Sequence, residues 1–209
     1  MSDMKDLIFD LGGVLLHWDP QAPGRAAGVT PEEMDLLTKG LFLHPDWLEL
    51  DRGTVEKDDV MQRTRERTGL DAGLIKRVFD TLTICLSPIP ESIELLRELS
   101  NEGHRVFVIS NMHEDSARYL ENNYDFWECF NDVLFSCDVK LVKPDEAIFR
   151  MAFERFGVDP SNAVFFDDTK ENVVAADRLG LNVIHFSSAA ETRRILREKG
   201  WALSGIPTT

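Results

Sequence analysis

Several polar residues stand at or near the ends of apolar runs, where a buried strand gives way to a loop. They are Asp10 after LIF, Ser110 and Asn111 after VFVI, Lys143 in KPD, and Asp167 with Asp168 after VFF. A carboxylate at the end of a buried strand is costly unless it is paired, binds a metal ion or takes part in a reaction. Carboxylates around Mg²⁺, with a lysine and hydroxyl donors that hold phosphate oxygens, form a phosphoryl-transfer site in which an aspartate can attack phosphorus.

The elements that must position these residues follow from the alternation along the chain. Apolar, β-rich runs occur at DLIFDLGG, HRVFVISN, NAVFFDD and LNVIHF, and FNDVLFS is a further strand region packed by nearby aromatic residues. Helical patterns such as ESIELLRELSNEG and DEAIFRMAFERFG lie between them. This order predicts an α/β fold with a parallel sheet covered on both faces. Ligands bind outside the carboxyl ends of such strands, so the polar residues should meet in one crevice.

Residues 17–87 have no convincing strand and contain several helical patterns. One of them opens with TPEE, in which Thr30 is an N-cap, Pro31 takes the first helical position and Glu33 completes a capping box. We therefore predict two parts. Residues 1–16 and 88–209 form a Rossmann-like, doubly wound parallel sheet core, and residues 17–87 form an inserted helical-bundle cap.

Composition limits the partners of this chain of 209 residues. Its formal net charge of -14 argues against nucleic acid and anionic membrane surfaces, which both bind basic proteins. Three scattered cysteines, Cys85, Cys129 and Cys137, fit neither a disulfide framework nor a zinc site. The sequence has no signal-peptide pattern and no apolar run long enough to span a membrane. We expect a cytoplasmic protein, either a monomer or a homodimer.

The sequences FDLGGVL, VISN, KLVKPD and FFDDTKENVVAADRLG resemble, in this order, the four motifs of the haloacid dehalogenase (HAD) superfamily of hydrolases. The helical insertion is similar to the small cap of subfamily I, so the resemblance covers nearly the whole chain. It implies a Mg²⁺-dependent phosphatase that acts on a small phosphorylated metabolite through an aspartyl phosphate. The combination of DLG, KPD and FFDD resembles the branch of α-glucose-1-phosphate phosphatase and the phosphatase domain of epoxide hydrolases, which suggests a sugar phosphate.

The resemblance also implies roles for the charged residues. Asp10 is the nucleophile and a metal ligand, and the backbone carbonyl of Gly12 is a further ligand. Asp168 binds magnesium, with Asp167 as a second ligand or a partner through water. Lys143 neutralises the charge of the nucleophile and of the phosphate.

Three polar residues receive supporting roles from the same resemblance. Ser110 binds the phosphate through its hydroxyl group. Asn111 contributes near the phosphate or the leaving group. Asn172 takes a position that is acidic in some members of the superfamily, and we expect it to support the metal ligands rather than to bind the metal.

Gly12 departs from the phosphatase pattern. Phosphatases of the superfamily usually carry an aspartate at this position, two residues after the nucleophile, where it protonates the leaving group and then activates water. Such a group contributes about 10² to 10⁴ in rate. Three explanations are open: the leaving group needs little protonation, another group or water supplies the proton, or turnover is poor. Candidates for a substitute are His17, Asp19, His113 and Glu114.

Two alternatives to a phosphatase remain. A 2-haloacid dehalogenase attacks carbon without magnesium, but by resemblance it carries an aromatic residue at the position of Gly12, so Gly12 and the pair Asp167 and Asp168 favour the phosphatase. A regulatory or binding protein that kept the fold and lost turnover would also fit the missing acid. Trp18 and Trp47, in the predicted cap, are either core residues or part of the substrate opening.

Overall fold

A computed structural model describes residues 5–203 of the chain. One parallel sheet has the strand order β3-β2-β1-β4-β5. The strands are β1 (Asp6–Phe9), β2 (Arg105–Ser110), β3 (Asp132–Phe135), β4 (Ala163–Asp167) and β5 (Asn182–His185). The predicted α/β class with a parallel sheet is therefore confirmed.

The register of the sheet aligns the ends of its central strands. Phe9 at the end of β1 pairs with Phe166 in β4, so the next residues, Asp10 and Asp167, are neighbours at one edge. On the other side of β1, Phe9 pairs with Val108, and β2 continues for two more residues to Ser110. The polar residues that follow these strands are thus gathered at the carboxyl edge, as the topology rule requires.

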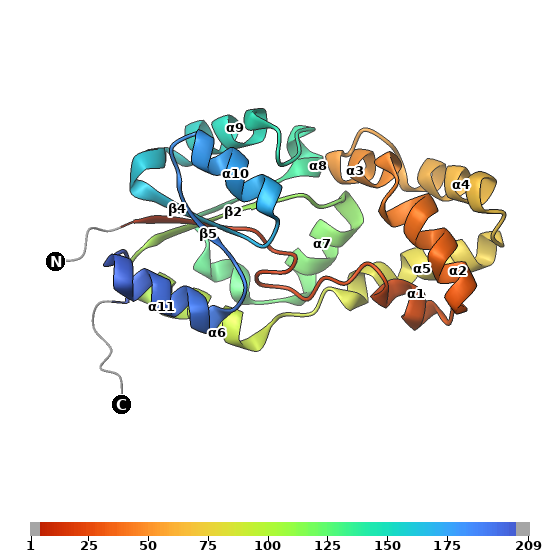
Figure 1. Cartoon of the computed structure of the whole chain (residues 1–209), viewed down its shortest axis with the longest axis horizontal. Helices are drawn as coiled ribbons and strands as arrows, with labels where there is room; N and C mark the ends of the chain where they lie inside the picture. The colour runs from red at the N-terminus through yellow and green to blue at the C-terminus, as the bar shows by residue number, and fades with distance from the viewer. Residues whose placement is uncertain (1–4, 204–209) are drawn as a thin grey trace.

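Helices cover both faces of the sheet (Figure 1). The apolar cluster on one face joins Ile8 and Phe107 to helices α9 (Glu146–Phe156) and α10 (Lys170–Arg178). The cluster on the other face joins Leu7 and Phe9 to the remaining long helices of the core. These are α6 (Pro90–Asn101), α7 (Glu114–Asn123) and α11 (Ala189–Lys199). Alternate residues of the strands face opposite layers, which explains why the strands are apolar throughout.

Short helical segments lie along the chain between β2 and β4. The segment η2 (Phe126–Cys129) precedes β3, the four-residue helix α8 (Ser136–Val139) follows it, and η3 (Pro160–Asn162) precedes β4. Trp127 packs against Phe126 at 4.7 Å and against Phe135 at 6.0 Å between ring centroids. The predicted packing of this aromatic segment beside the third strand region is therefore confirmed.

The chain between β1 and α6 forms a separate group of helices beside the sheet (Figure 1). They are α1 (Ala22–Ala27), α2 (Pro31–Leu37), the π-helical η1 (Thr38–Phe42), α3 (Pro45–Arg52), α4 (Lys57–Thr68) and α5 (Ala72–Cys85). The group has an apolar cluster of its own, centred on residues such as Leu41, Val60 and Val78. The boundaries of the predicted core and cap, at residues 16/17 and 87/88, stay a prediction.

The start of α2 has the capping box that the sequence predicts. The backbone N–H of Glu33 donates to Thr30 Oγ1 at 3.2 Å, and the backbone N–H of Thr30 donates to Glu33 Oε2 at 2.8 Å. Pro31 occupies the first turn, where a missing N–H has no cost. This prediction of a helix start is confirmed.

Two observations bear on the expectations from composition. No helix within residues 5–203 is both long enough and apolar enough to cross a bilayer. The three cysteines carry free thiols, and Cys137 is a buried residue of α8.

Candidate active site

The centre of the site is a buried lysine between two carboxylates. Lys143 Nζ lies 2.9 Å from Asp10 Oδ1 and 2.7 Å from Asp167 Oδ2. The side chain of Lys143 is 1% exposed and that of Asp167 is fully buried. The orientation of Asp167 is fixed further, because Asn172 Nδ2 donates to both of its oxygens at 3.1 Å. The backbone N–H of Thr169 adds a bond to Oδ1 at 2.8 Å.

The loop after β1 holds Asp10 and brings Asp168 close. The backbone N–H of Leu11 donates to Asp10 Oδ1 at 2.7 Å. Gly13 has a φ of +72°, and a Cβ at this position would lie 2.1 Å from Asp168 Oδ2. Only glycine allows both this conformation and this approach. The second glycine of FDLGG therefore permits Asp168 to reach the loop that follows β1.

Asn111 and Lys143 form two reciprocal hydrogen bonds, which connect the end of β2 to the loop that carries Lys143. Asn111 Nδ2 donates to the carbonyl of Lys143 at 2.9 Å, and the backbone N–H of Lys143 donates to Asn111 Oδ1 at 2.8 Å. The side-chain amide of Asn111 thus fixes the main chain that carries the ammonium group. Ser110, the last residue of β2, is 1% exposed and lines the pocket beside it.

The site holds three acidic residues, Asp10, Asp167 and Asp168, beside one buried lysine, Lys143. Burial raises the pKa of Asp10 to about 7; Lys143 opposes this effect and the charge of Asp167 adds to it. Burial and Asp167 also raise the pKa of Asp168. For Lys143 burial lowers the pKa, but Asp10 and Asp167 more than offset burial and raise it. The ammonium group is therefore charged, and within residues 5–203 it is the one cation that pairs with these three acidic residues, at Asp10 and Asp167.

A divalent cation fits this donor set. Asp10, Asp167 and Asp168 each offer an oxygen, and these oxygens all lie within 4.8 Å of one another. Carboxylate oxygens are hard ligands of the kind that Mg²⁺ prefers. The excess of negative charge at a buried position gives a physical reason for such an ion to bind here.

Replacing Lys143 with methionine is expected to destabilise the fold by about 3–5 kcal/mol, because the change leaves Asp10 and Asp167 buried without their counter-charge. Denaturant unfolding in buffer without divalent cations measures the loss. Lys170→Met, on the exposed surface of α10, is the control and should change stability by less than about 0.5 kcal/mol. Equal stability of the two variants would contradict the view of Lys143 as the main balancing charge.

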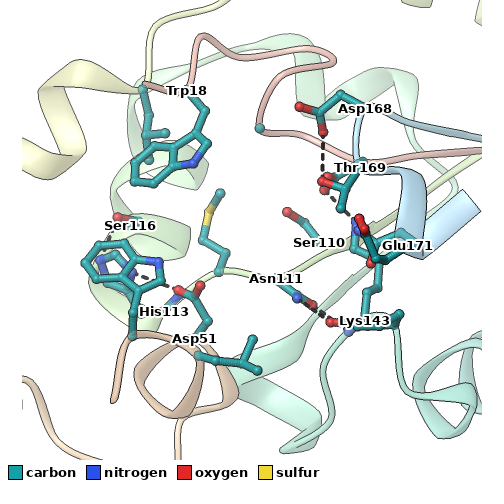
Figure 2. A pocket seen from close by; sticks show the side chains of 18 of the residues that line it. Trp18, Asp51, Ser110, Asn111, His113, Ser116, Lys143, Asp168, Thr169 and Glu171 are labelled. Carbon is teal, nitrogen blue, oxygen red and sulfur yellow. Dashed lines mark hydrogen bonds and ion pairs between the residues drawn. The ribbon is translucent and has the colours of Figure 1, made fainter. Parts of the chain in front are cut away.

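A pocket of about 420 Å³ opens from this group of charges. Its polar side includes Lys143, Ser110 and Asp168, and Thr169 and Glu171 continue this side along the start of α10 (Figure 2). The opposite side carries residues of the helical group, among them Trp18 and Asp51 (Figure 2). The pocket therefore lies between the carboxyl edge of the sheet and the inserted helices.

Of the four candidates for the missing acid, only His113 lines this pocket. Asp19 forms an exposed ion pair with Arg25, and the exposed side chains of His17 and Glu114 are not part of the lining. Position 12 itself borders the pocket next to Trp18.

His113 forms a hydrogen-bonded group with Asp51 and Ser116, two residues that the sequence did not single out. Its Nδ1 lies 3.3 Å from Asp51 Oδ1, and its Nε2 lies 2.8 Å from Ser116 Oγ. The backbone N–H of His113 donates to the same oxygen of Asp51 at 3.1 Å. Ser116 stands three residues after His113 in the first turn of α7, whereas Asp51 comes from α3, so only the packing of α3 brings Asp51 to the histidine.

The fold and the site define a hydrolase of the haloacid dehalogenase type, and the chain belongs to the haloacid dehalogenase-like hydrolase family, whose model matches residues 4–180. It is 28% identical over 198 residues to a sesquiterpene phosphatase of Aspergillus oryzae, covering 94% of this chain and 97% of the relative. It is 27% identical to a phosphorylated carbohydrates phosphatase of Thermotoga maritima, covering 87% and 84% of the two chains.

The fold is also similar to that of solved structures. A HAD family enzyme from Bacteroides thetaiotaomicron, solved in complex with magnesium and inorganic phosphate, superposes with a TM-score of 0.70 at 22% identity, covering 89% of this chain and 96% of the other. At this identity the likeness establishes the fold. It agrees with the parallel sheet and the inserted helices described above.

Proposed function

We propose that this hydrolase is a Mg²⁺-dependent phosphomonoesterase that acts on a small phosphorylated metabolite through an aspartyl phosphate on Asp10. The observation that carries the proposal is a group of three carboxylates, two of them buried, and one buried lysine at the carboxyl edge of the sheet, next to a pocket. This arrangement provides a nucleophile, charge balance and cation ligands in one place, as phosphoryl transfer requires.

The similar proteins support the same reaction class. The relatives from A. oryzae and T. maritima are both phosphatases by name, and the similar structure from B. thetaiotaomicron holds magnesium and phosphate. The finer placement, in a branch with α-glucose-1-phosphate phosphatase and the epoxide hydrolase phosphatase domain, is part of the proposal. It rests on the motifs DLG, KPD and FFDD alone.

In the first step, a carboxylate oxygen of Asp10 attacks phosphorus and the bond between phosphorus and the ester oxygen breaks. Oδ1 accepts bonds from Leu11 and Lys143, so Oδ2 is the oxygen oriented for attack. Lys143 balances the charge that gathers on the phosphate, and the Ser110 hydroxyl donates to a phosphate oxygen. The alcohol oxygen leaves with a proton from water, because Gly12 has no side chain that can supply one.

In the second step, water adds to the phosphorus of the aspartyl phosphate, and Asp10 is released as a carboxylate with inorganic phosphate as the product. The water loses one proton to solvent. Asn111 takes part indirectly, since its amide holds the main chain of Lys143. Burial of the site excludes bulk water during the first step, which strengthens the electrostatic contacts to the phosphate.

The residues that would hold Mg²⁺ are Asp10, the carbonyl of Gly12 and Asp168. Asp167 already accepts bonds from Lys143, Asn172 and Thr169, so we assign it to the orientation of the site and to contact with the ion through water. When bound, the ion neutralises part of the phosphate charge and so makes the phosphorus easier to attack.

Release of inorganic phosphate, with Mg²⁺ and in EDTA, tests the proposal. The panel contains p-nitrophenyl phosphate, glucose 1-phosphate and a nucleoside monophosphate, and 2-chloropropionate serves to detect halide release. We expect phosphate release that requires Mg²⁺ and no halide release, because attack at phosphorus depends on charge neutralisation.

The other outcomes favour the alternatives. Halide release that persists in EDTA would contradict the proposal in favour of a dehalogenase. Tight binding of Mg²⁺ and phosphate without release from any ester would support a binding or regulatory protein. Glucose 1-phosphate also tests the suggestion of a sugar phosphate, since its anomeric leaving group needs little protonation.

A further inference from the structure

The pocket beyond the phosphate end has an apolar wall. Trp18 lies in the connection from β1 to the helical group, and Trp47 lies in α3. The wall as a whole consists of Trp18, Trp47, Leu48, Leu82, Leu86 and Met112. All but Met112 lie between β1 and α6, so this side of the pocket comes almost entirely from the inserted segment.

Two of these apolar side chains are more than one third exposed to water. Trp18 is 37% exposed and Leu48 is 38% exposed, and both face the pocket. Large apolar side chains left open to water in a concave site indicate a surface that a ligand covers. Folding stability does not explain their position, because both would be buried more fully in a packed core.

The tryptophans form a rigid surface that begins beside the nucleophile loop. Their rings stack at 5.9 Å between centroids. The other contacts of Trp47 are edge contacts with Phe42 at 5.1 Å and His113 at 5.7 Å. Trp18 approaches position 12, since a Cβ on Gly12 would lie 3.5 Å from Trp18 Cβ. A group bonded to the phosphate would therefore meet the indole of Trp18 first.

The polar residues on this side of the pocket are bonded to one another. His113 contacts Asp51 and Ser116 through its two ring nitrogens, as described above. These three lie across the pocket from Lys143 and Asp168 (Figure 2). A sugar would need several partners for its hydroxyl groups, because a buried hydroxyl without a partner is costly. The leucine and methionine side chains of the wall supply none, and each indole offers a single N–H donor and no acceptor.

We propose that the substrate is the phosphate monoester of an apolar alcohol, whose hydrocarbon part lies against Trp18, Trp47 and Leu48. The inference rests on the proposed phosphatase function and names its substrate class. It assigns substrate selection to the inserted helices and phosphate binding to the core.

A series of n-alkyl phosphates from ethyl to octyl, compared with glucose 1-phosphate and p-nitrophenyl phosphate, tests this inference. We expect kcat/KM to rise about two- to fourfold for each added methylene group until the pocket is filled. Calorimetry with the matching alkylphosphonates, which are not hydrolysed, should show the same order of affinity for the Mg²⁺-loaded protein and a negative heat-capacity change.

Single substitutions test which side chains of the apolar wall cause the dependence on chain length. Trp18→Ala and Leu48→Ala should both lower kcat/KM for octyl phosphate, by about tenfold for the tryptophan, and Leu48→Ala should leave ethyl phosphate nearly unchanged. Both side chains are more than one third exposed, so their truncation should not prevent folding. Leu43→Ala is the matched control, because Leu43 is 75% exposed on the same helical group and does not line the pocket.

Two results would overturn the inference. A flat response to chain length, or a preference for glucose 1-phosphate over octyl phosphate, would reject the apolar substrate and leave the phosphatase in place. No phosphate release from any ester, p-nitrophenyl phosphate included, together with equal affinity for short and long phosphonates, would reject both proposals.

Discussion

Replacing Asp10 with asparagine is expected to lower phosphate release by about 10⁴-fold or more, because an amide cannot form the acyl phosphate. The side chain keeps its size and its bond to the backbone N–H of Leu11, which an amide oxygen also accepts. Steady-state phosphate release under saturating Mg²⁺ measures the effect. Mass spectrometry of acid-quenched reactions should detect the phosphorylated wild-type chain and no phosphorylated variant.

The Asp10→Asn variant should fold at least as stably as the wild type in metal-free buffer. Burial and Asp167 disfavour the charged form of Asp10, as its pKa of about 7 indicates, and asparagine removes that charge. Lys143 keeps Asp167 as a partner at 2.7 Å. Thermal unfolding of both proteins in EDTA separates a loss of chemistry from a loss of structure.

Asp19→Asn is the matched control for this experiment. Asp19 carries the same functional group on the connection to the helical group, but it is exposed and pairs with Arg25. The variant should retain activity within about twofold, because an exposed ion pair contributes little to stability. Comparable losses in the two variants, or an Asp10→Asn variant that still turns over, would contradict the assignment of the nucleophile.

The strand ends could be predicted from the sequence because parallel strands deliver their last residues to one edge. Asp10 and Asp167 end apolar runs, and the register places them side by side. The same rule places Ser110, the last residue of β2, at this edge of the sheet. Lys143 was predicted from its order among the motifs. The structure adds the physical reason for its position, because the side chain of Asn111 holds the main chain of Lys143 at the end of β2 with two hydrogen bonds.

The cap side of the pocket could not be predicted in the same way. Ser116 follows His113 by three residues, but Asp51 and His113 lie far apart in the sequence, and no spacing links them. Their contact depends on how the inserted helices pack on the core, which periodicity does not specify. Trp18 and Trp47 were uncertain for the same reason, since a tryptophan in a helical segment is equally consistent with a core position.

Replacing Gly12 with aspartate is expected to raise kcat for alkyl phosphates by about 10² to 10³-fold, toward the lower part of the range that a general acid contributes. The structure can accept the side chain. A Cβ at position 12 would lie 3.5 and 3.7 Å from Trp18 Cβ and Cγ, which is ordinary van der Waals contact. The pocket borders this position, so the new carboxyl group would have room beside the ester oxygen.

The dependence on leaving group distinguishes acid catalysis from a change in binding. An alkoxide requires a proton as it departs, whereas p-nitrophenolate is stable without one, so Gly12→Asp should accelerate octyl phosphate far more than p-nitrophenyl phosphate. Gly12→Asn is the matched control, since it has nearly the same shape and cannot transfer the proton. A similar gain with asparagine would mean that the new side chain acts on binding and not as an acid. No gain with aspartate would mean that another group already protonates the leaving alcohol, and His113 would then be the first residue to replace.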